Sequence, residues 1–358
     1  MPISLSVRAT RIAISPRLAM STFSNTAAQS IYVAGGRAGR GGLLALASPR
    51  HRGETLPRSG TRFHRPKAGD RRRRGDPRAP PGQQAIRVRR LVIELQSHST
   101  VSDGQLAPAQ VVAEAAKAGV TTLALTDHDA IAGVPEAAEA AERLGIELVP
   151  AIEMSCVHEY AEDLHVCGYW VDLGAIAPAC ERAQHERVAR AGEIVEKLRG
   201  EGFDLHLEDA VREAGDALSI GRPHIARAAG AEGDLGPFFE EYLVPGAKAF
   251  VPRRWPTAEQ AVETIKQAGG IAVVAHPYWD ISEPAEVEEL IRALGVDGVE
   301  TFYPTHSKEQ TEHLLALCEE LDLIPTASSD YHGPTHKTFA KFGAYDTYGL
   351  AEPQVPRL

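Results

Sequence analysis

The sequence predicts an α/β protein in which strands alternate with helices, in an order and number that fit an incomplete or distorted (β/α) barrel. Two observations predict this fold class. Short apolar runs recur between helical segments, which is typical of parallel strands joined by crossover helices. In addition, six of these runs present histidine, aspartate or glutamate at or just beyond one end. This placement is expected where a site forms at the carboxyl ends of parallel strands.

Seven apolar runs are predicted to be strands. In chain order they are Leu91–Leu95, Thr122–Thr126, Leu148–Ile152, Leu164–Tyr169, Ile271–Ala275, Val296–Phe302 and Ile324–Ser328. Five helices are expected within this alternation, at Ala107–Ala118, Val134–Leu144, Thr257–Ala268, Pro284–Leu294 and Lys308–Leu321. The first three of these helices are followed directly by glycine, which is a common helix stop.

Residues 176–249 interrupt the alternation and predict a helical insertion within the sheet domain. The insertion has three helical patterns, at Cys180–Arg199, His206–Ala214 and Arg222–Ala229. The barrel would then consist of residues 90–175 and 250–345, followed by a C-terminal tail at 346–358. Several basic residues stand out in or just after this insertion: Arg222, His224, Lys248, Arg253 and Arg254. They are either ordinary surface charge or part of an anion-binding lid.

The charge of the chain is unevenly distributed. The formal net charge is −10, but residues 1–90 contain 19 Lys and Arg against three acids, about +16, so the remainder carries about −26. Residues 1–89 are rich in Arg, Gly, Ser and Pro, which predicts disorder. This segment is a nucleic-acid-binding arm, a transit peptide, or the product of a start codon assigned too far upstream. We favour the last interpretation, because the folded domain begins near Leu91 without a linker.

Composition also narrows the class of protein. A hydrophobic content of 43% with 24% charged residues is typical of a globular protein with a sizeable core. No apolar stretch reaches the length of a membrane span, so no membrane association is expected. The four cysteines form no C-x-x-C pair, so we expect neither a zinc-ribbon nor a redox motif, and a reducing, cytoplasmic setting. Cys156 and Cys167 flank predicted ligand strands and are expected to be small core residues. Nothing indicates an obligate protein partner.

The polar residues near the strand ends predict a metal centre. The set contains five histidines and three acids, with a glutamine beside them: His98, Asp103, His128, Glu153, His165, His276, Asp330, His332 and Gln96. Eight such groups are too many for one tetrahedral zinc ion. Mixed nitrogen and oxygen ligands without thiolate favour Mn²⁺, with Zn²⁺ or Fe²⁺ as alternatives. Clustered divalent cations activate water and neutralise charge on phosphoryl oxygens, which indicates hydrolysis of a phosphate ester.

The successive motifs LQSHSTVSDG, LTDHD, AIEMS, DLHVCGY, AHP and SSDYHG resemble those of the PHP (polymerase and histidinol phosphatase) superfamily. The resemblance covers about residues 91–343 and is strongest to the stand-alone phosphoesterase branch, similar to nucleoside 3′,5′-bisphosphate phosphatases and short-RNA 5′-exonucleases. It implies a distorted (β/α)7 barrel with a helical insertion. It also implies two or three divalent ions, with Mn²⁺ first and Mg²⁺ among the alternatives. The expected substrate is a small phosphorylated molecule or a short single-stranded nucleic acid.

The resemblance implies a role for each matching residue. Glu153 would bridge two metals, with His98 and Asp330 on one metal and His165 and His276 on the other. Asp103, His128 and His332 would hold a third. Arg222, His224 and Arg254 would match phosphate-binding groups. The expected catalytic residues are Asp103, His128, Glu153, Arg222 and His276, and the expected substrate contacts also include His306.

Gln96 departs from the family pattern, whose first motif is usually H-x-H. A neutral amide is a poorer ligand than imidazole for a transition metal, so one metal site is expected to be weaker. Two alternatives remain open: a phosphatase for another small ester such as histidinol phosphate, and a lapsed enzyme that binds without turnover. Two neighbouring acids have smaller expected roles. Asp127 would orient the His128 imidazole, and Asp129 would cap the next helix.

Overall fold

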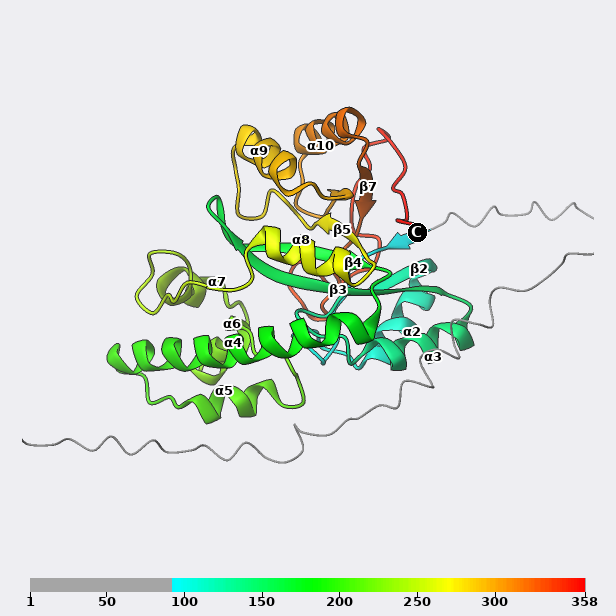
Figure 1. Ribbon diagram of the computed structural model, residues 1–358. Coiled ribbons are helices and arrows are strands. Elements are labelled where there is room, and N and C mark those ends of the chain that lie inside the picture. Colours follow the sequence, from blue (N-terminus) through cyan, green and yellow to red (C-terminus); the bar gives the residue numbers. More distant parts are fainter. Residues whose placement is uncertain (1–91, 358) are drawn as a thin grey trace, which may run out of the picture. The chain divides into compact units, whose positions relative to one another are not determined.

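The computed structural model describes residues 92–357, which form seven strands in one sheet (Figure 1). The strands lie side by side in chain order: β1 (Val92–Glu94), β2 (Val120–Leu125), β3 (Glu147–His158), β4 (Ala161–Tyr169), β5 (Ile271–Val274), β6 (Gly298–Phe302) and β7 (Ile324–Ala327). Each of the seven predicted apolar runs overlaps one of these strands, so an α/β fold with a seven-stranded sheet is confirmed. The interpretations of residues 1–89 concern residues outside the described part.

One strand runs against its neighbours. The pairs β1–β2 and β2–β3 are parallel, as are β5–β6 and β6–β7, but β4 is antiparallel to both β3 and β5. The expectation of parallel strands is therefore wrong at β4. The reason is the connection. Only two residues separate β3 from β4, and so short a link can join antiparallel strands but cannot hold a crossover helix.

The helices between the other strands agree closely with the residue ranges predicted from the sequence. They are α2 (Pro108–Ala118), α3 (Val134–Leu144), α8 (Ala258–Gln267), α9 (Pro284–Leu294) and α10 (Lys308–Leu321). Thr257 and Ser307 cap α8 and α10 through their hydroxyl groups. Gly119 and Gly145 end α2 and α3 in the left-handed conformation, which costs glycine little. Apolar side chains of α8, α9 and α10 pack with β3, β4 and β5 in one core cluster.

The two edge strands of the sheet are linked to each other. The backbone N–H of Leu95, just after β1, donates to the carbonyl of Ala327 in β7 at 3.1 Å. Beyond the strand ends, His98 N–H donates to the Tyr331 carbonyl at 2.8 Å, and Ser97 and Tyr331 form a parallel bridge. These contacts bring the segments after β1 and β7 together, although they are far apart in the sequence.

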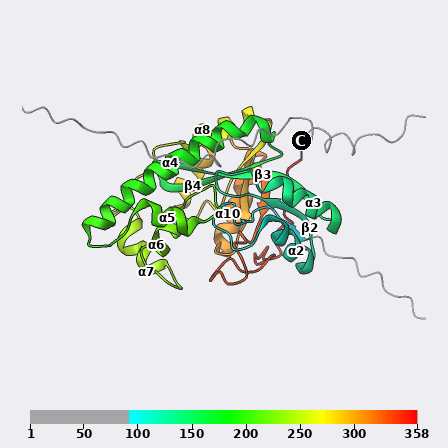
Figure 2. The same cartoon turned by 90° about the horizontal axis from the view of Figure 1, so that it is seen from below.

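The predicted insertion consists of helices with an apolar cluster of their own. Figures 1 and 2 show α5 (Leu207–Ala214) and α6 (Arg222–Ala228) beside the long helix α4 (Leu173–Gly200). Their cluster includes Ile194 and Leu198 from α4 and Ile225 from α6. Helix α4 begins earlier than the predicted Cys180. A short helix α7 (Gly236–Phe238) and the π-helical turn η2 (Phe239–Leu243) lack a counterpart in the predictions. Among the described residues, none of the helices combines the length and hydropathy of a membrane span.

Candidate metal centre

The predicted histidines and acids meet in one place, delivered by six different strands or the loops after them. His98 and Asp103 follow β1, His128 follows β2, His276 follows β5, and Asp330 and His332 follow β7. Glu153 and His165 lie within β3 and β4 instead. They reach the same place because β3 is twelve residues long and continues past the end of β2, where Glu153 forms a parallel bridge with His128.

Glu153 is the centre of this group, and each of its carboxylate oxygens faces two imidazoles. Its Oε2 atom lies 3.1 Å from His98 Nε2 and 3.1 Å from His128 Nδ1. Its Oε1 atom lies 2.9 Å from His165 Nδ1 and 3.3 Å from His276 Nε2. The carboxylate is fully buried. A single buried carboxylate among four ring nitrogens is an arrangement suited to bridging two cations.

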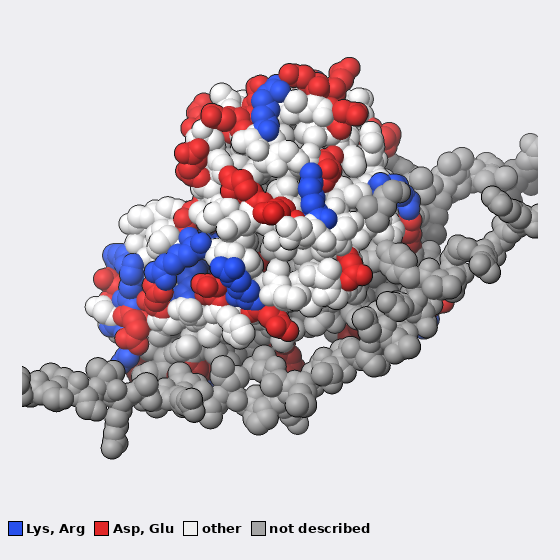
Figure 3. Space-filling model, in the orientation of Figure 1, with Lys and Arg blue, Asp and Glu red and all other residues white. Residues whose placement is uncertain are grey.

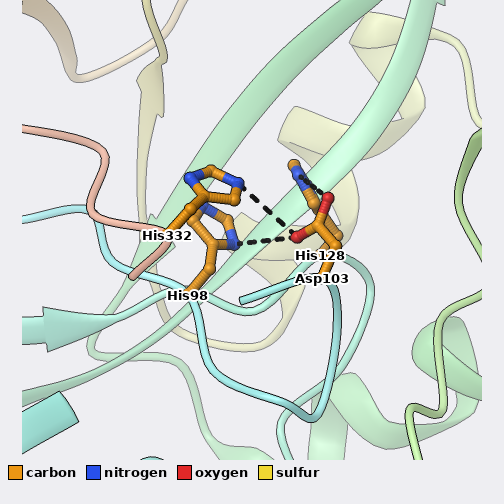
Figure 4. A group of neighbouring side chains, drawn as sticks. All are labelled: His98, Asp103, His128 and His332. Atoms are coloured by element: carbon orange, nitrogen blue, oxygen red, sulfur yellow. Dashed lines mark ion pairs between the residues drawn. The ribbon is translucent and has the colours of Figure 1, made fainter. Parts of the chain in front are cut away.

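Asp103 is the centre of a second group of imidazoles, next to the group around Glu153 (Figure 4). Its Oδ1 atom lies 3.5 Å from His332 Nε2 and 3.9 Å from His98 Nδ1, and its Oδ2 atom lies 3.9 Å from His128 Nε2. Asp330 adds a further carboxylate, with Oδ1 3.1 Å from His98 Nε2. His98 and His128 therefore lie near both Glu153 and Asp103, so the two groups form one continuous cluster.

The polar atoms of this cluster fit a metal. Several are buried and lack a hydrogen-bond partner: His98 Nδ1 and Nε2, His128 Nδ1, Asp103 Oδ1, Glu153 Oε2 and Asp330 Oδ1. Buried polar groups without a partner are costly, and a divalent cation would satisfy several of them together. Two sets have ligand atoms within 4.8 Å of one another: His98, Asp103, His128 and His332, and His128, Glu153 and His165. Burial lowers the pKa of His128 to about 3, which keeps its imidazole neutral, as a metal ligand must be.

Backbone strain marks two of the candidate ligands. His276 and Asp330 have φ angles of 26° and 52°, a region that L-residues other than glycine adopt at a cost and that is concentrated at functional sites. The backbone N–H of His276 is held by Glu300 Oε2 at 2.8 Å, and the Tyr303 hydroxyl donates to Asp330 Oδ2 at 2.9 Å. The surrounding structure therefore fixes both residues in place.

Gln96 lies inside the cluster as a hydrogen-bond donor. Its amide Nε2 donates to Glu153 Oε1 at 2.9 Å, the same oxygen that faces His165 and His276. Its own Oε1 atom is buried and has no hydrogen-bond partner. If the oxygen and nitrogen of this amide exchanged positions, the amide oxygen instead of the nitrogen would face Glu153.

Asp127 and Asp129 do not have the predicted roles. The Asp127 carboxylate accepts hydrogen bonds from Ser99 N, Ser99 Oγ and Ser102 Oγ, each at 2.7 Å. It therefore positions the loop that carries His98 and Asp103. Asp129 accepts from Ser155 N at 3.0 Å and from Arg187 Nε at 2.6 Å, whereas α3 starts after Gly133. Neither carboxylate orients the His128 ring or caps the helix, because each is occupied by a donor from elsewhere in the fold.

The predicted phosphate-binding residues have different surroundings. Arg222, at the start of α6, pairs closely with Asp163, which lies two residues before His165 on β4. His224 is buried, and its Nδ1 accepts from Gly221 N–H. The exposed Arg254 pairs through both terminal nitrogens with Glu193, at 2.7 and 2.9 Å. His306 is buried against Tyr278 and Tyr303, and its Nδ1 is 3.0 Å from the Thr301 carbonyl oxygen, so it lies outside the cluster.

Sequence reasoning missed two residues next to this site: Asp163 and Arg187. Asp163 could have been found, because on a strand it shares a face with His165 two positions later. The sequence assigns Arg253 either to ordinary surface charge or to an anion-binding lid. Its burial, with 8% of the residue exposed, depends on where the chain runs after the helical region. All four cysteines are buried and free, which agrees with the prediction that Cys156 and Cys167 are small core residues.

A buried cluster of histidines and carboxylates at one edge of an α/β sheet is the kind of site that metal-dependent α/β enzymes use. A model of the PHP domain matches residues 94–213. A 5′-3′ exoribonuclease of Haemophilus influenzae is 36% identical over 249 residues, covering 67% of this chain and 90% of that protein. This chain therefore belongs to the PHP domain family.

Two proteins of Chromobacterium violaceum give a consistent result. A 3′,5′-nucleoside bisphosphate phosphatase is 34% identical over 251 residues, covering 68% of this chain and 87% of its own length. The solved structure of an amidohydrolase with bound sulfate has a TM-score of 0.66 and 32% identity, covering 73% of this chain and 93% of that one. The similarity thus extends over most of the length of each of these two relatives and over about 70% of this chain.

Proposed function

We propose that this protein is a metal-dependent phosphoesterase that hydrolyses a phosphate monoester of a nucleotide or short oligonucleotide. The observation that carries the proposal is the Glu153 carboxylate, which is buried among four imidazoles with further acids on either side. The relatives named as an exoribonuclease and a nucleoside bisphosphate phosphatase support the substrate class. The contacts between the segments after β1 and β7 further support closure of the sheet into a distorted (β/α)7 barrel.

Two or three divalent ions would be held by the cluster, and we favour Mn²⁺ because the ligands combine imidazole with carboxylate. Glu153 would be shared between one site with His98 and Asp330 and another with His165 and His276. Asp103, His128 and His332 would hold the third. When bound, such ions activate water and neutralise charge on phosphoryl oxygens. Asp127 holds the loop with two of the ligands, and Glu300 fixes His276.

The protein contributes binding and orientation around this centre. Asp163 holds Arg222 beside His165: its Oδ1 atom is 3.9 Å from His165 Nε2. From there the Arg222 guanidinium would contact the phosphoryl group, with His224 next to it. The acidic part of the chain favours a small substrate or a short single strand, since extended duplex binding needs many Lys and Arg contacts. We also propose a cytoplasmic location, which the four free buried cysteines support.

A substrate panel tests the proposed reaction. With Mn²⁺ present, phosphate release from nucleoside 3′,5′-bisphosphates or short phosphorylated RNA should exceed release from histidinol phosphate by at least about tenfold in kcat/KM. The physical reason is that added contacts to base, sugar and phosphate stabilise the transition state. Release from histidinol phosphate alone would contradict the nucleotide assignment and favour the small-ester alternative.

Metal removal tests the centre without relying on turnover. Dialysis against a chelator should lower the thermal unfolding midpoint, and adding Mn²⁺ at about 100 times its Kd should restore about 2.7 kcal/mol of stability. For a domain of this size, that corresponds to roughly 5–10 °C. The control is NaCl at the same ionic strength, because a monovalent salt changes screening without supplying a divalent cation. Equal midpoints with and without Mn²⁺ would contradict a metal centre.

The Gln96 hydrogen bond favours a second candidate, a protein that keeps the fold and binds metal or nucleotide without turnover. The amide group of Gln96 donates to an oxygen of Glu153 that a metal would otherwise share. This candidate predicts metal binding in the experiment above together with no phosphate release from any member of the panel.

A further inference from the structure

An exposed aromatic ring lies beside the candidate metal centre. Trp279 lies in the segment after β5, and 50% of the residue is exposed. The other two tryptophans of the chain have contacts of their own: Trp170 Nε1 donates to the Pro356 carbonyl at 2.7 Å, and the Arg182 guanidinium lies over the Trp255 ring. Single exposed apolar side chains are common, so exposure alone does not mark a site. The surroundings of Trp279 distinguish it.

A turn brings the Trp279 ring next to His276, a candidate metal ligand. The Trp279 backbone N–H donates to the His276 carbonyl at 2.8 Å. The centroids of the two rings are 6.0 Å apart, with an angle of 64° between their planes. The same imidazole has its Nε2 atom 3.3 Å from Glu153 Oε1. A molecule bound at His276 and Glu153 would therefore have the indole as a neighbour.

Two buried rings support the exposed one. Tyr303, directly after β6, and Phe339, in the loop after β7, are 2% and 6% exposed. Their ring centroids lie 6.4 and 5.8 Å from that of Trp279, and 5.8 Å from each other. Such separations are typical of favourable aromatic pairs. We call Trp279, Tyr303 and Phe339 the aromatic platform, of which Trp279 is the exposed member.

Both buried rings of the aromatic platform are also held to candidate metal ligands. The Tyr303 hydroxyl donates to Asp330 Oδ2 at 2.9 Å. The Phe339 carbonyl accepts from the His332 N–H at 3.0 Å, and the rings of these two residues lie 5.7 Å apart. The platform therefore has a fixed position relative to the centre. This reduces the conformational entropy that a ligand must overcome when it binds.

The charges around the aromatic platform disfavour a phosphoryl group there. Residues 280–289, which follow Trp279, contain five acids and no Lys or Arg. Figure 3 shows that Asp and Glu predominate on the surface around α9 and α10, whereas Lys and Arg gather on the α4–α7 side. This negative charge would repel a phosphate next to Trp279. The part of a substrate that lies on the indole is therefore expected to be flat and to carry no negative charge.

We propose that Trp279 stacks against the base of the nucleoside whose phosphate is hydrolysed at the metal centre. The inference rests on the proposed function and adds to it the residue that contacts the base. A nucleoside carries phosphate and base on the same sugar, so a phosphoryl group near Glu153 and His276 leaves the base one sugar away, beside the indole. Stacking uses the π face that every base has, so the platform recognises the presence of a base and not its identity.

Replacement of Trp279 by alanine tests the stacking contact. In the Mn²⁺-loaded full-length protein, we compare adenosine 3′,5′-bisphosphate with the sugar bisphosphate that lacks the base. The preference for the base-bearing substrate, measured as the ratio of kcat/KM values, should fall about 5- to 100-fold, mainly through KM, because one base–aromatic stack is lost. Uridine 3′,5′-bisphosphate should show a loss in the same range, since stacking does not depend on the identity of the base.

Three further variants serve as comparisons. W279F keeps an aromatic ring and should retain most of the preference. W279L keeps apolar bulk without a ring and should lose the preference, and it replaces W279A if that variant does not fold. L144A is the matched control, because Leu144 is 48% exposed but ends α3, next to the start of β3 and away from the carboxyl ends of the strands. Its ratio should equal that of the wild type.

A binding measurement separates this inference from the proposed function. Tryptophan fluorescence of the Mn²⁺-loaded protein is recorded on rapid mixing with adenosine 5′-monophosphate or with ribose 5-phosphate. The nucleotide should quench the emission and the sugar phosphate should not, and W279F should remove this difference although Trp170 and Trp255 remain. If the wild type shows this quenching yet hydrolyses no substrate, the stacking contact stands and the phosphatase assignment fails.

Three results would overturn the stacking contact. An equal loss of kcat/KM for the base-bearing and base-free substrates in W279A would mean that the ring only supports His276. An unchanged ratio in W279A, with fluorescence that the nucleotide does not alter, would remove the base from Trp279 while phosphate hydrolysis stands. A loss confined to histidinol phosphate would assign the exposed ring to a cationic ester.

Discussion

Replacing Glu153 with glutamine should abolish metal binding at the shared position and reduce phosphate release by at least about a thousandfold in kcat, on the scale of losing a principal electrostatic contact in a catalytic site. The variant keeps the size of the side chain but removes the negative charge that faces four imidazoles. Metal content per chain, measured by mass spectrometry of the purified protein, should fall together with activity.

The matched control for this variant is Glu147→Gln on the same strand. Glu147 lies at the start of β3 and pairs with Arg357 away from the cluster, so its loss should leave metal content unchanged and cost at most about 1 kcal/mol of stability. A Glu153→Gln protein that retains its metals and its activity within tenfold would show that the buried carboxylate does not bridge cations.

Replacing Gln96 with histidine should add a ligand to the Glu153 cluster. The amide donates to Glu153 Oε1, whereas a neutral imidazole would offer a nitrogen lone pair to a cation at the same place. We expect tighter metal binding by about 10- to 100-fold, which is typical of changes around a metal site, and a higher kcat. Isothermal titration with Mn²⁺ gives the stoichiometry and affinity.

Gln96→Ala is the control for Gln96→His. It removes the hydrogen bond without adding a ligand, so it should not gain metal affinity to the same degree. If histidine and alanine have the same effect, Gln96 acts only by blocking Glu153. If the wild type is inert and only Gln96→His is active, the natural protein has lost turnover, and the second candidate function applies.

Much of the fold could be predicted because local sequence fixes it. The apolar runs are long enough only for strands, and the boundaries of α3, α9 and α10 agree with the helical patterns that glycine, proline or serine delimit. Pairing direction at β4 could not be predicted in this way. Apolar periodicity is the same for parallel and antiparallel strands, and the two-residue link after His158 was not recognised as a hairpin.

The residues that come together in the candidate site could also be predicted, but their hydrogen-bond partners could not. Histidines and acids at strand ends converge because neighbouring strands end at the same edge of the sheet. Hydrogen-bond partners depend on the tertiary structure. Asp127 sits beside His128 in sequence, yet its carboxylate holds Ser99 and Ser102. Adjacency in the sequence does not show which donor groups from other loops will form hydrogen bonds with a buried carboxylate.

The sequence by itself determined the α/β class, the seven strands and the family, and it predicted the residues of the candidate metal centre, because these depend on short-range patterns. Only the tertiary structure decided that Glu153 faces four imidazoles, that Gln96 donates to it, and that Arg253 is buried with an Nε atom that has no hydrogen-bond partner among the described residues. The physical reason is that burial and charge balance are properties of the folded chain. The sequence does not show whether an arginine side chain is removed from water, or whether the carboxylates near it are already paired with other groups.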